Sequence, residues 1–196
     1  MSSTKRILLR FYLILSLLFV INGLLYYYKE ISLRGYYSDA ILFWLWLLMS
    51  FVIIILFWKK LLAKLFLAAL IVTFALSIIA MMLPFYALIN STTSLGLYIN
   101  KDLNENYRAQ IVGYGPMVYP WLEVIEKKGL LEKRIIKCTD SDLMNDNLDI
   151  KIRTAKDIIF KSETDSTLVL TLFYGGPNKT ITFDKHTGKI ISIQNN

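Results

Sequence analysis

The sequence predicts a membrane protein of the α plus β class, in which three N-terminal transmembrane helices precede a small, antiparallel, mostly β domain. Hydrophobic residues make up 55% of the 196-residue chain, yet charged residues still reach 19%. A high hydrophobic content and a substantial charged content are compatible if the chain has an apolar part and a polar part, and the long apolar runs all lie in the first 89 residues. We therefore expect a transmembrane region at 1–89, a linker at 90–106 and an outer β domain at 107–196, folded as a meander or a sandwich.

Three apolar runs predict the membrane spans, at residues 7–28, 40–58 and 65–89. At a rise of 1.5 Å per residue, each is long enough to cross a hydrocarbon core of about 30 Å. Continuous apolar runs indicate helices, because barrel strands alternate. Pro84 is expected to kink or end the third helix. The first run also resembles a signal peptide, but no cleavage site of small residues follows, which favours an uncleaved anchor.

The basic residues near the spans predict the orientation. Residues 1–89 contain eight basic and two acidic side chains. Six of the basic residues flank the N-terminus or the connection between the second and third spans: Lys5, Arg6, Arg10, Lys59, Lys60 and Lys64. Because such residues remain on the cytoplasmic side, we expect a cytoplasmic N-terminus and extracytoplasmic residues 90–196. We expect the membrane to be a bacterial inner (plasma) membrane.

The distribution of charge argues against two functional classes. Residues 90–196 contain 14 basic and 13 acidic side chains, so the folded domain is nearly neutral and nucleic-acid binding is not expected. The spans carry no ionisable residue near the bilayer midplane, which argues against a proton-coupled or ion-coupled transporter. The lipid bilayer is the one partner that composition predicts directly.

Alternating β-branched and aromatic segments, separated by turn residues, predict the strands of the outer domain. The expected strands are 107–114, 121–126, 132–139, 157–162, 167–174, 179–183 and 189–193, with shorter ones at 97–99 and 150–154. Residues 184–188 form the expected loop of the last hairpin, with Gly188 in the left-handed conformation.

The candidates for catalysis are weak. His186 is the only histidine and lies in the expected hairpin loop, and Cys138 is the only cysteine and lies on an expected strand. Neither has a partner in the sequence that would activate it. No zinc spacing, phosphate-binding loop or dinucleotide fingerprint is present. We predict a protein that is not an enzyme, with no catalytic residue and no cofactor.

An acidic segment is the only metal candidate. Four carboxylates within ten residues, all hard oxygen ligands of the kind that calcium prefers, come from Asp140, Asp142, Asp146 and Asp149. The segment departs from an EF-hand loop, because Met144 and Asn145 replace a ligand and the glycine. A solvated acidic loop is the preferred interpretation, so no metal site is assigned.

Small residues on the third span predict a helix-packing face. Ala69, Thr73 and Ser77 recur every four residues, which places them on one side of a helix and allows close approach of another backbone. Two interpretations remain open: packing against the other spans of this chain, or contact with a partner subunit or a second copy of this chain.

Two similar turns in the outer domain predict an aromatic patch. Residues 113–116 and 174–177 combine an aromatic residue, glycine and proline, a pattern typical of chain reversal. The patch that we expect consists of Tyr114, Tyr119, Trp121 and Tyr174. Core packing is the simpler interpretation, and a surface for a protein partner is the functional one.

Taken together, these observations favour a non-enzymatic membrane protein whose outer domain binds an as yet unidentified protein. Two alternatives remain: an immunity-type inhibitor of a membrane-active toxin, and an auxiliary subunit of a transport or secretion complex.

Overall fold

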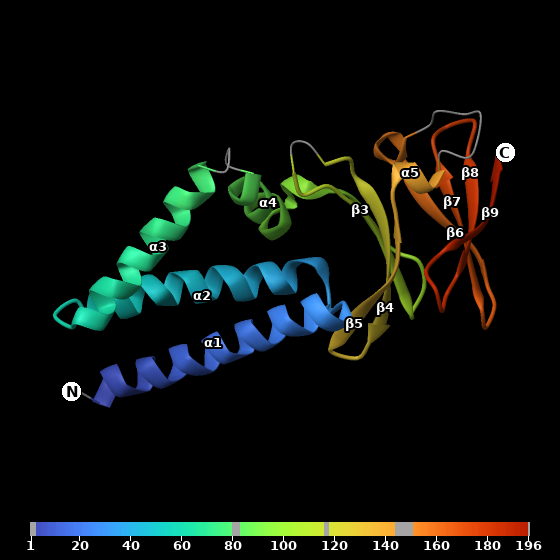
Figure 1. Ribbon diagram of the computed structural model, residues 1–196. Coiled ribbons are helices and arrows are strands. Elements are labelled where there is room, and N and C mark those ends of the chain that lie inside the picture. The colour runs from blue at the N-terminus through green and yellow to red at the C-terminus, as the bar shows by residue number, and fades with distance from the viewer. Residues whose placement is uncertain (1–2, 80–82, 116–117, 144–150, 196) are drawn as a thin grey trace.

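The protein is described by a computed structural model that covers residues 3–79, 83–115, 118–143 and 151–195. Within these ranges, apolar helices form one end of the molecule and two antiparallel sheets form the other (Figure 1). Three helices are long and apolar enough to cross a membrane: α1 (Ser3–Lys29), α2 (Tyr36–Leu56) and α3 (Leu61–Ile79). The predicted membrane α plus β class is confirmed.

Helices α1 and α2 form an antiparallel hairpin. Trp46 of α2 stacks on Phe19 of α1 with 5.0 Å between ring centroids, and its indole N–H donates to the Ser16 hydroxyl over 3.1 Å. Nearer the N-terminus, the hydroxyls of Tyr12 and Ser50 lie 3.0 Å apart in a hydrogen bond. The few polar residues of these spans therefore bond across the helix pair, as polar side chains within an apolar medium must.

The third predicted span, residues 65–89, differs from the structure. Helix α3 begins earlier, at Leu61, and a separate helix α4 (Leu83–Thr92) follows it. Pro84 is the second residue of α4, where its missing N–H costs no intrahelical hydrogen bond. The side chains of Tyr36 and Trp44 donate to backbone carbonyls at the end of α4, from Tyr36 to Thr93 over 2.7 Å and from Trp44 to Thr92 over 3.1 Å. These bonds hold α4 against α2.

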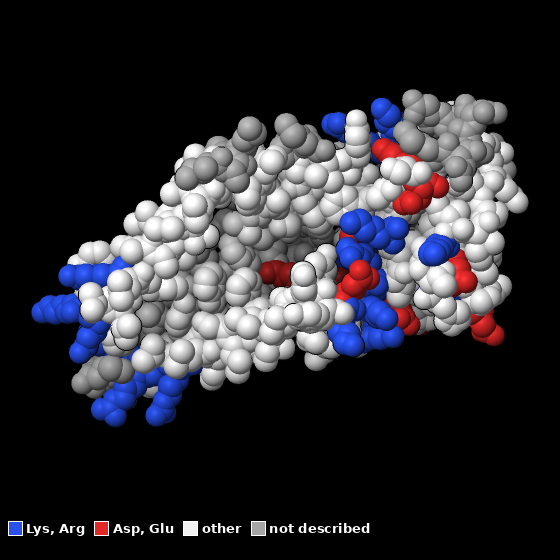
Figure 2. Space-filling model, viewed as in Figure 1, with Lys and Arg blue, Asp and Glu red and all other residues white. Residues whose placement is uncertain are grey.

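The basic flanks lie at the end of the helical region that is distant from the sheets. Lys5, Arg6 and Arg10 belong to the start of α1, and Lys59, Lys60 and Lys64 to the α2–α3 connection and the first turn of α3. Figure 2 shows this end of the molecule as a basic group of side chains. The β domain follows the opposite end.

The sheet nearer the helices, sheet A, has the strand order β1-β5-β4-β3-β2. Its strands are β1 (Ile31–Leu33), β2 (Leu97–Asp102), β3 (Tyr107–Val112), β4 (Trp121–Lys128) and β5 (Leu131–Cys138). Strand β1 comes from the connection between the first two spans, and β2 lies within the expected linker 90–106. Strand β1 was not predicted, because three residues give little periodic signal, whereas the short strand predicted at 97–99 is present and extends to Asp102.

The farther sheet, sheet B, is a meander with the order β6-β7-β8-β9. Its strands are β6 (Asp157–Glu163), β7 (Thr167–Phe173), β8 (Lys179–Asp184) and β9 (Ile190–Asn195). Between the sheets lie the short helix α5 (Asp140–Leu143) and the 3₁₀ turn η2 (Ile152–Thr154). The strand expected at 150–154 is therefore wrong over residues 152–154.

The core of the β domain lies between the two sheets. Ile111, Leu122 and Val124 of sheet A and Leu170, Ile181 and Phe183 of sheet B are all fully buried there. One face of sheet A is thus occupied by apolar packing. Its other face is turned toward the helices (Figure 1), and polar side chains of this face line a cavity there.

Candidate functional site

The helix-facing surface of sheet A is polar and buried. Alternate residues of its three central strands contribute the side chains, which are Arg108 and Gln110 on β3, Trp121 and Glu123 on β4, and Glu132 and Arg134 on β5. Five of the six are no more than 9% exposed, and Arg134 is the exception. Burying charged groups is costly unless they are paired, and each charged group on this surface has a partner of opposite charge.

Glu123 is the centre of one half of this polar surface. Its carboxylate accepts hydrogen bonds from Gln110 (2.7 Å), from the Trp121 indole N–H (2.8 Å) and from the Arg134 guanidinium (2.9 Å). Gln110 lies directly opposite Glu123 in the β3–β4 register. Burial opposes the charge of Arg134, but its hydrogen bonds and attraction to Glu30, Tyr26 and Glu123 outweigh burial and raise its pKa.

Arg108 and Glu132 are the centre of the other half. The Arg108 guanidinium donates to Glu132, to Gln110 and, over 3.0 Å, to Asn100. The second oxygen of Glu132 accepts the backbone N–H of Gly35 over 2.9 Å. Gly35 precedes α2 and has a φ of +92°, a conformation that favours glycine. This ion pair therefore connects the sheet to the start of a membrane helix.

The connection between α1 and α2 is bound along the edge of β5. Strand β1 pairs antiparallel with β5, with Ile31 opposite Lys133 and Leu33 opposite Leu131. The Arg34 N–H donates to the Leu130 carbonyl over 3.0 Å. The β domain is thus fixed on the helices by backbone pairing as well as by ion pairs.

A cavity of about 370 Å³ lies between this surface and the helices. Its polar wall is formed by sheet A, and its apolar wall includes Phe19, Ala40 and Phe43. Asp39, in the first turn of α2, also lines it and accepts a hydrogen bond from Asn22 of α1 over 2.8 Å. Figure 2 shows an acidic side chain inside a hollow between the helices. We call this space the juxtamembrane cavity.

The structure divides the predicted aromatic patch. The rings of Tyr114 and Trp121 pack edge to face, with 5.3 Å between their centroids. Tyr114 lines the juxtamembrane cavity, where burial raises its pKa. Tyr119 is 70% exposed. Tyr174 packs instead against the core between the sheets, and burial raises its pKa as well. The four residues do not form one surface.

The predicted acidic segment is described only in part. Asp140 and Asp142 belong to α5, whereas Asp146 and Asp149 lie outside the described residues. Asp142 accepts hydrogen bonds from the N–H and hydroxyl of Thr139, both 2.7 Å, and Asp140 accepts the Ile152 N–H over 2.7 Å. In the part of the chain that is described, both carboxylates accept hydrogen bonds from protein donors, and no group of three metal-ligating side chains is found.

The predicted helix-packing face lies on α3. Ala69 and Thr73 are exposed and Ser77 is half-buried. The Thr73 hydroxyl donates to the Ala69 carbonyl and the Ser77 hydroxyl to the Phe74 carbonyl, both within α3. Ala69 and Thr73 are thus not covered by the described helices of this chain.

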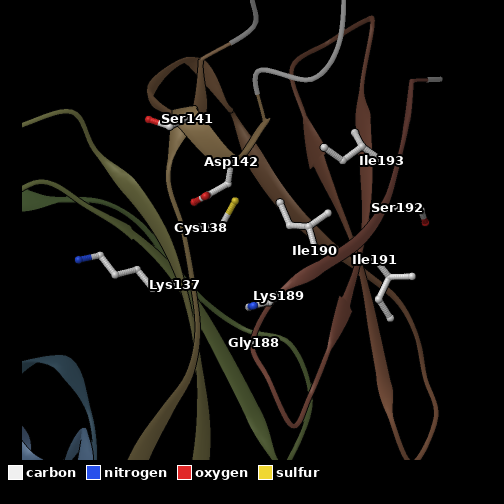
Figure 3. A pocket seen from close by; sticks show the side chains of 10 residues that line it. All are labelled: Lys137, Cys138, Ser141, Asp142, Gly188, Lys189, Ile190, Ile191, Ser192 and Ile193. Carbon is white, nitrogen blue, oxygen red and sulfur yellow. The ribbon is translucent and has the colours of Figure 1, made fainter.

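A second hollow lies at the side of the β domain, between β5 and β9. This edge groove has a volume of about 640 Å³ and is lined by Lys137 and Cys138 of β5, by Ser141 and Asp142 of α5, and by residues 188–193. Figure 3 shows Cys138 and Ile190 directed toward each other across it, whereas Ile191 and Ser192 point away. Burial, with the nearby charges of Asp142 and Asp140, raises the pKa of Cys138 to about 12, so its thiol is protonated at neutral pH.

Among the residues that line the two hollows, the sequence pattern indicated Tyr114, Cys138 and Asp142 but not the polar residues of sheet A. The only histidine, His186, is an exposed turn residue whose N–H donates to Asp184. The available signal was the presence of Arg108, Gln110 and Glu123 at alternate positions between apolar residues, which is unusual for strands that are buried on both faces.

The fold and these sites define a class: a membrane protein with three apolar helices that carries a two-sheet β domain docked on the helix ends. Comparison with protein-family models, with curated proteins and with solved structures found no match to this chain.

Proposed function

We propose that this is a non-enzymatic membrane protein whose β domain faces outward and binds a protein partner, by adding an extended segment of the partner to β9. The observation that carries the proposal is the chemistry of the sheet edges. Edge strands β2 and β6 contain charged residues, Lys101 and Asp102 in β2 and Asp157, Lys161 and Glu163 in β6. Strand β9 contains neither charge nor proline, a property that it shares, among the edge strands, only with the three-residue β1.

Charges on an edge strand are the usual protection against pairing with another chain. Strand β9 pairs with β8 on one side, and among the described residues no strand pairs with its other side. A bulge at Ile191 interrupts the register, but the residues that follow are regularly paired with β8. An extended peptide bound there gains main-chain hydrogen bonds from the edge and side-chain contacts from the groove.

The edge groove supplies the pockets for alternate side chains of such a segment. Its wall is apolar at Cys138 and Ile190, basic at Lys137 and Lys189, and acidic at Asp142. A segment with small apolar residues at alternate positions and a charged residue at each end would complement this wall. The outward orientation is supported by the basic group at the opposite end of the helices.

The proposal is tested by site-specific photo-crosslinking in the native membrane. A photoreactive residue at Ile191, which is 56% exposed, should crosslink one protein, and the same residue at Leu130, which is 87% exposed on the β4–β5 turn, should not. The crosslinked segment, made as a peptide, should slow hydrogen exchange of the amides in β9. Equal crosslinking at both positions, or exchange in β9 that the peptide leaves unchanged, would contradict the proposal.

A second candidate is an auxiliary subunit of a membrane complex. It is favoured by the exposure of Ala69 and Thr73 on α3, which leaves a small-residue face available to another helix. Replacing Ala69, Thr73 and Ser77 by leucine should then abolish co-purification of the complex in mild detergent. Leu67→Ala, elsewhere on α3, is the control, and assembly that survives the triple change would exclude this function.

A further inference from the structure

The juxtamembrane cavity spans the boundary between the membrane and the outer domain. On α1 its lining extends from Phe19 to Tyr26, close to the end of the helix at Lys29. At 1.5 Å per residue, Phe19 lies about 15 Å along the helix from this end. The cavity therefore reaches from the headgroup level into the outer leaflet. Its volume of about 370 Å³ is within the range of small-molecule sites, roughly 300–1,000 Å³.

Acidic groups outnumber basic groups on the cavity wall. The described lining includes four carboxylates, Glu30, Asp39, Glu123 and Glu132, but only two guanidinium groups. Arg134 is paired with Glu30 and Glu123, and Arg108 with Glu132. Buried carboxylates without a matching cation are costly in a medium of low dielectric, so this wall favours a cationic ligand.

Asp39 is the carboxylate without a cation. It accepts hydrogen bonds from the Asn22 amide over 2.8 Å and from the Leu33 N–H over 3.4 Å, both to the same oxygen. Among the described residues no Lys or Arg lies within ion-pair distance of it. An ionisable side chain at the end of a membrane span, bonded but not neutralised, is a candidate ligand-binding group.

The same wall also holds donors that lack acceptors. The Nε–H groups of Arg108 and Arg134 are buried, and neither has a hydrogen-bond partner among the described residues. Arg108 is only 6% exposed. Because a buried donor without an acceptor is destabilising, an acceptor from a bound molecule would relieve this cost. The cavity thus has a place for a cation and a place for an anion.

We propose that the juxtamembrane cavity binds the headgroup of a membrane lipid that carries a primary ammonium and a phosphate, as phosphatidylethanolamine does. The ammonium donates to Asp39, and the phosphate accepts from the guanidinium groups of Arg108 and Arg134. The acyl chains lie along the apolar wall at Phe19 and Phe43. The lipid is favoured over a soluble molecule of the same headgroup chemistry because this wall belongs to membrane helices.

The test measures lipid binding by the full chain. The purified, delipidated protein in detergent is titrated with phosphatidylethanolamine, phosphatidylcholine or phosphatidylglycerol, and the bound lipid is counted by native mass spectrometry. Phosphatidylcholine keeps the charge but lacks ammonium N–H donors, and phosphatidylglycerol lacks the cation. We expect phosphatidylethanolamine to bind about tenfold more tightly than either, the value of one charge-assisted hydrogen bond.

Two variants and one competitor separate the alternatives. Asp39→Asn keeps the shape and the Asn22 contact but removes the charge, and it should abolish the preference for phosphatidylethanolamine. Asp157→Asn, an acid on the far sheet, should leave it unchanged. Equal affinity for the three lipids in the wild type, or a preference that survives Asp39→Asn in folded protein, would overturn the proposal. If glycerophosphoethanolamine, the soluble headgroup, binds as tightly as the lipid, the claim that the ligand is a membrane lipid would be overturned.

Discussion

Glu30, the residue after the first membrane helix, is bonded twice to Arg134 of β5, on the helix-facing side of the β domain. Its carboxylate accepts from the Arg134 guanidinium over 2.8 Å, and its backbone carbonyl accepts the Arg134 N–H over 3.0 Å. Glu30 itself has a φ of +58°, a left-handed conformation that few residues other than glycine adopt. The chain leaves α1 through this strained residue and passes directly into β1.

Replacing Arg134 should loosen the β domain from the helices. Arg134→Gln removes the ion pairs to Glu30 and to the buried Glu123, and leaving a buried carboxylate unpaired costs about 3 kcal/mol. We expect the melting temperature in detergent to fall by about 5–10 °C and hydrogen exchange in residues 31–35 to increase. Lys133→Gln, an exposed neighbour on β5, is the control. An equal fall in melting temperature in both variants would contradict the role of Arg134 in holding the β domain on the helices.

Two glycines with the same backbone conformation should respond differently to alanine. Gly188 (φ +69°) and Gly129 (φ +65°) are both left-handed, which costs alanine about 1–2 kcal/mol in either place. A Cβ on Gly188 would also lie 2.6 Å from the Ile135 carbonyl oxygen, whereas at Gly129 the space is open. Gly188→Ala should therefore destabilise the protein clearly more than Gly129→Ala. Thermal melting compares them, and equal effects would show that the β8–β9 turn does not pack on β5.

Cys138 should resist alkylation in the folded protein. Burial raises its pKa to about 12, and only 1% of the residue is exposed. An unfolded thiol ionises near pH 8.5, so at pH 9 the unfolded chain is largely thiolate while the folded chain is not. We expect maleimide labelling at pH 9, followed by mass spectrometry, to be slow until detergent or urea unfolds the domain. Rapid labelling of folded protein would show that the edge groove opens to Cys138.

The stabilisation that comes from the ion pair between the two sheets should depend on pH through the protonation of its aspartate. Lys101 of β2 donates to Asp157 of β6 over 2.7 Å, and this hydrogen bond lowers the pKa of Asp157. A lowered pKa means that the stabilisation is present above about pH 4, the unfolded pKa of aspartate, and is lost as the pH falls through the folded pKa. Both side chains are about two-fifths exposed, so the pair contributes at most about 0.5 kcal/mol.

This dependence is measured by comparing the melting temperatures of the wild type and Asp157→Asn between pH 7 and pH 2. The small advantage of the wild type should disappear at low pH, and added salt should reduce it at pH 7. An advantage that grows as the pH falls would have the wrong sign for this pair.

Local patterns were sufficient to predict the helical hairpin and most strands. The continuous apolar runs of α1 and α2 have no other stable structure in a bilayer, and alternation such as that of Leu168, Leu170 and Leu172 indicates one buried face. The sites were less predictable, because Tyr114 and Tyr174 look alike in their turns but pack on opposite faces of sheet A. The face of the sheet on which such a tyrosine packs depends on how strands that are distant in the sequence pair with one another.

The sequence by itself determined the two-part layout, because apolar length and charge are properties of the chain alone. Tertiary structure decided the sites. Residues 132, 134, 136 and 138 alternate and would share one face of a regular strand, but the register shift opposite Val124 and Ile125 leaves Ile135 as an extra residue. Glu132 and Arg134 therefore face the membrane helices, while Ile136 and Cys138 enter the core. Strand pairing fixes this change of face, and the chain carries no local signal for it.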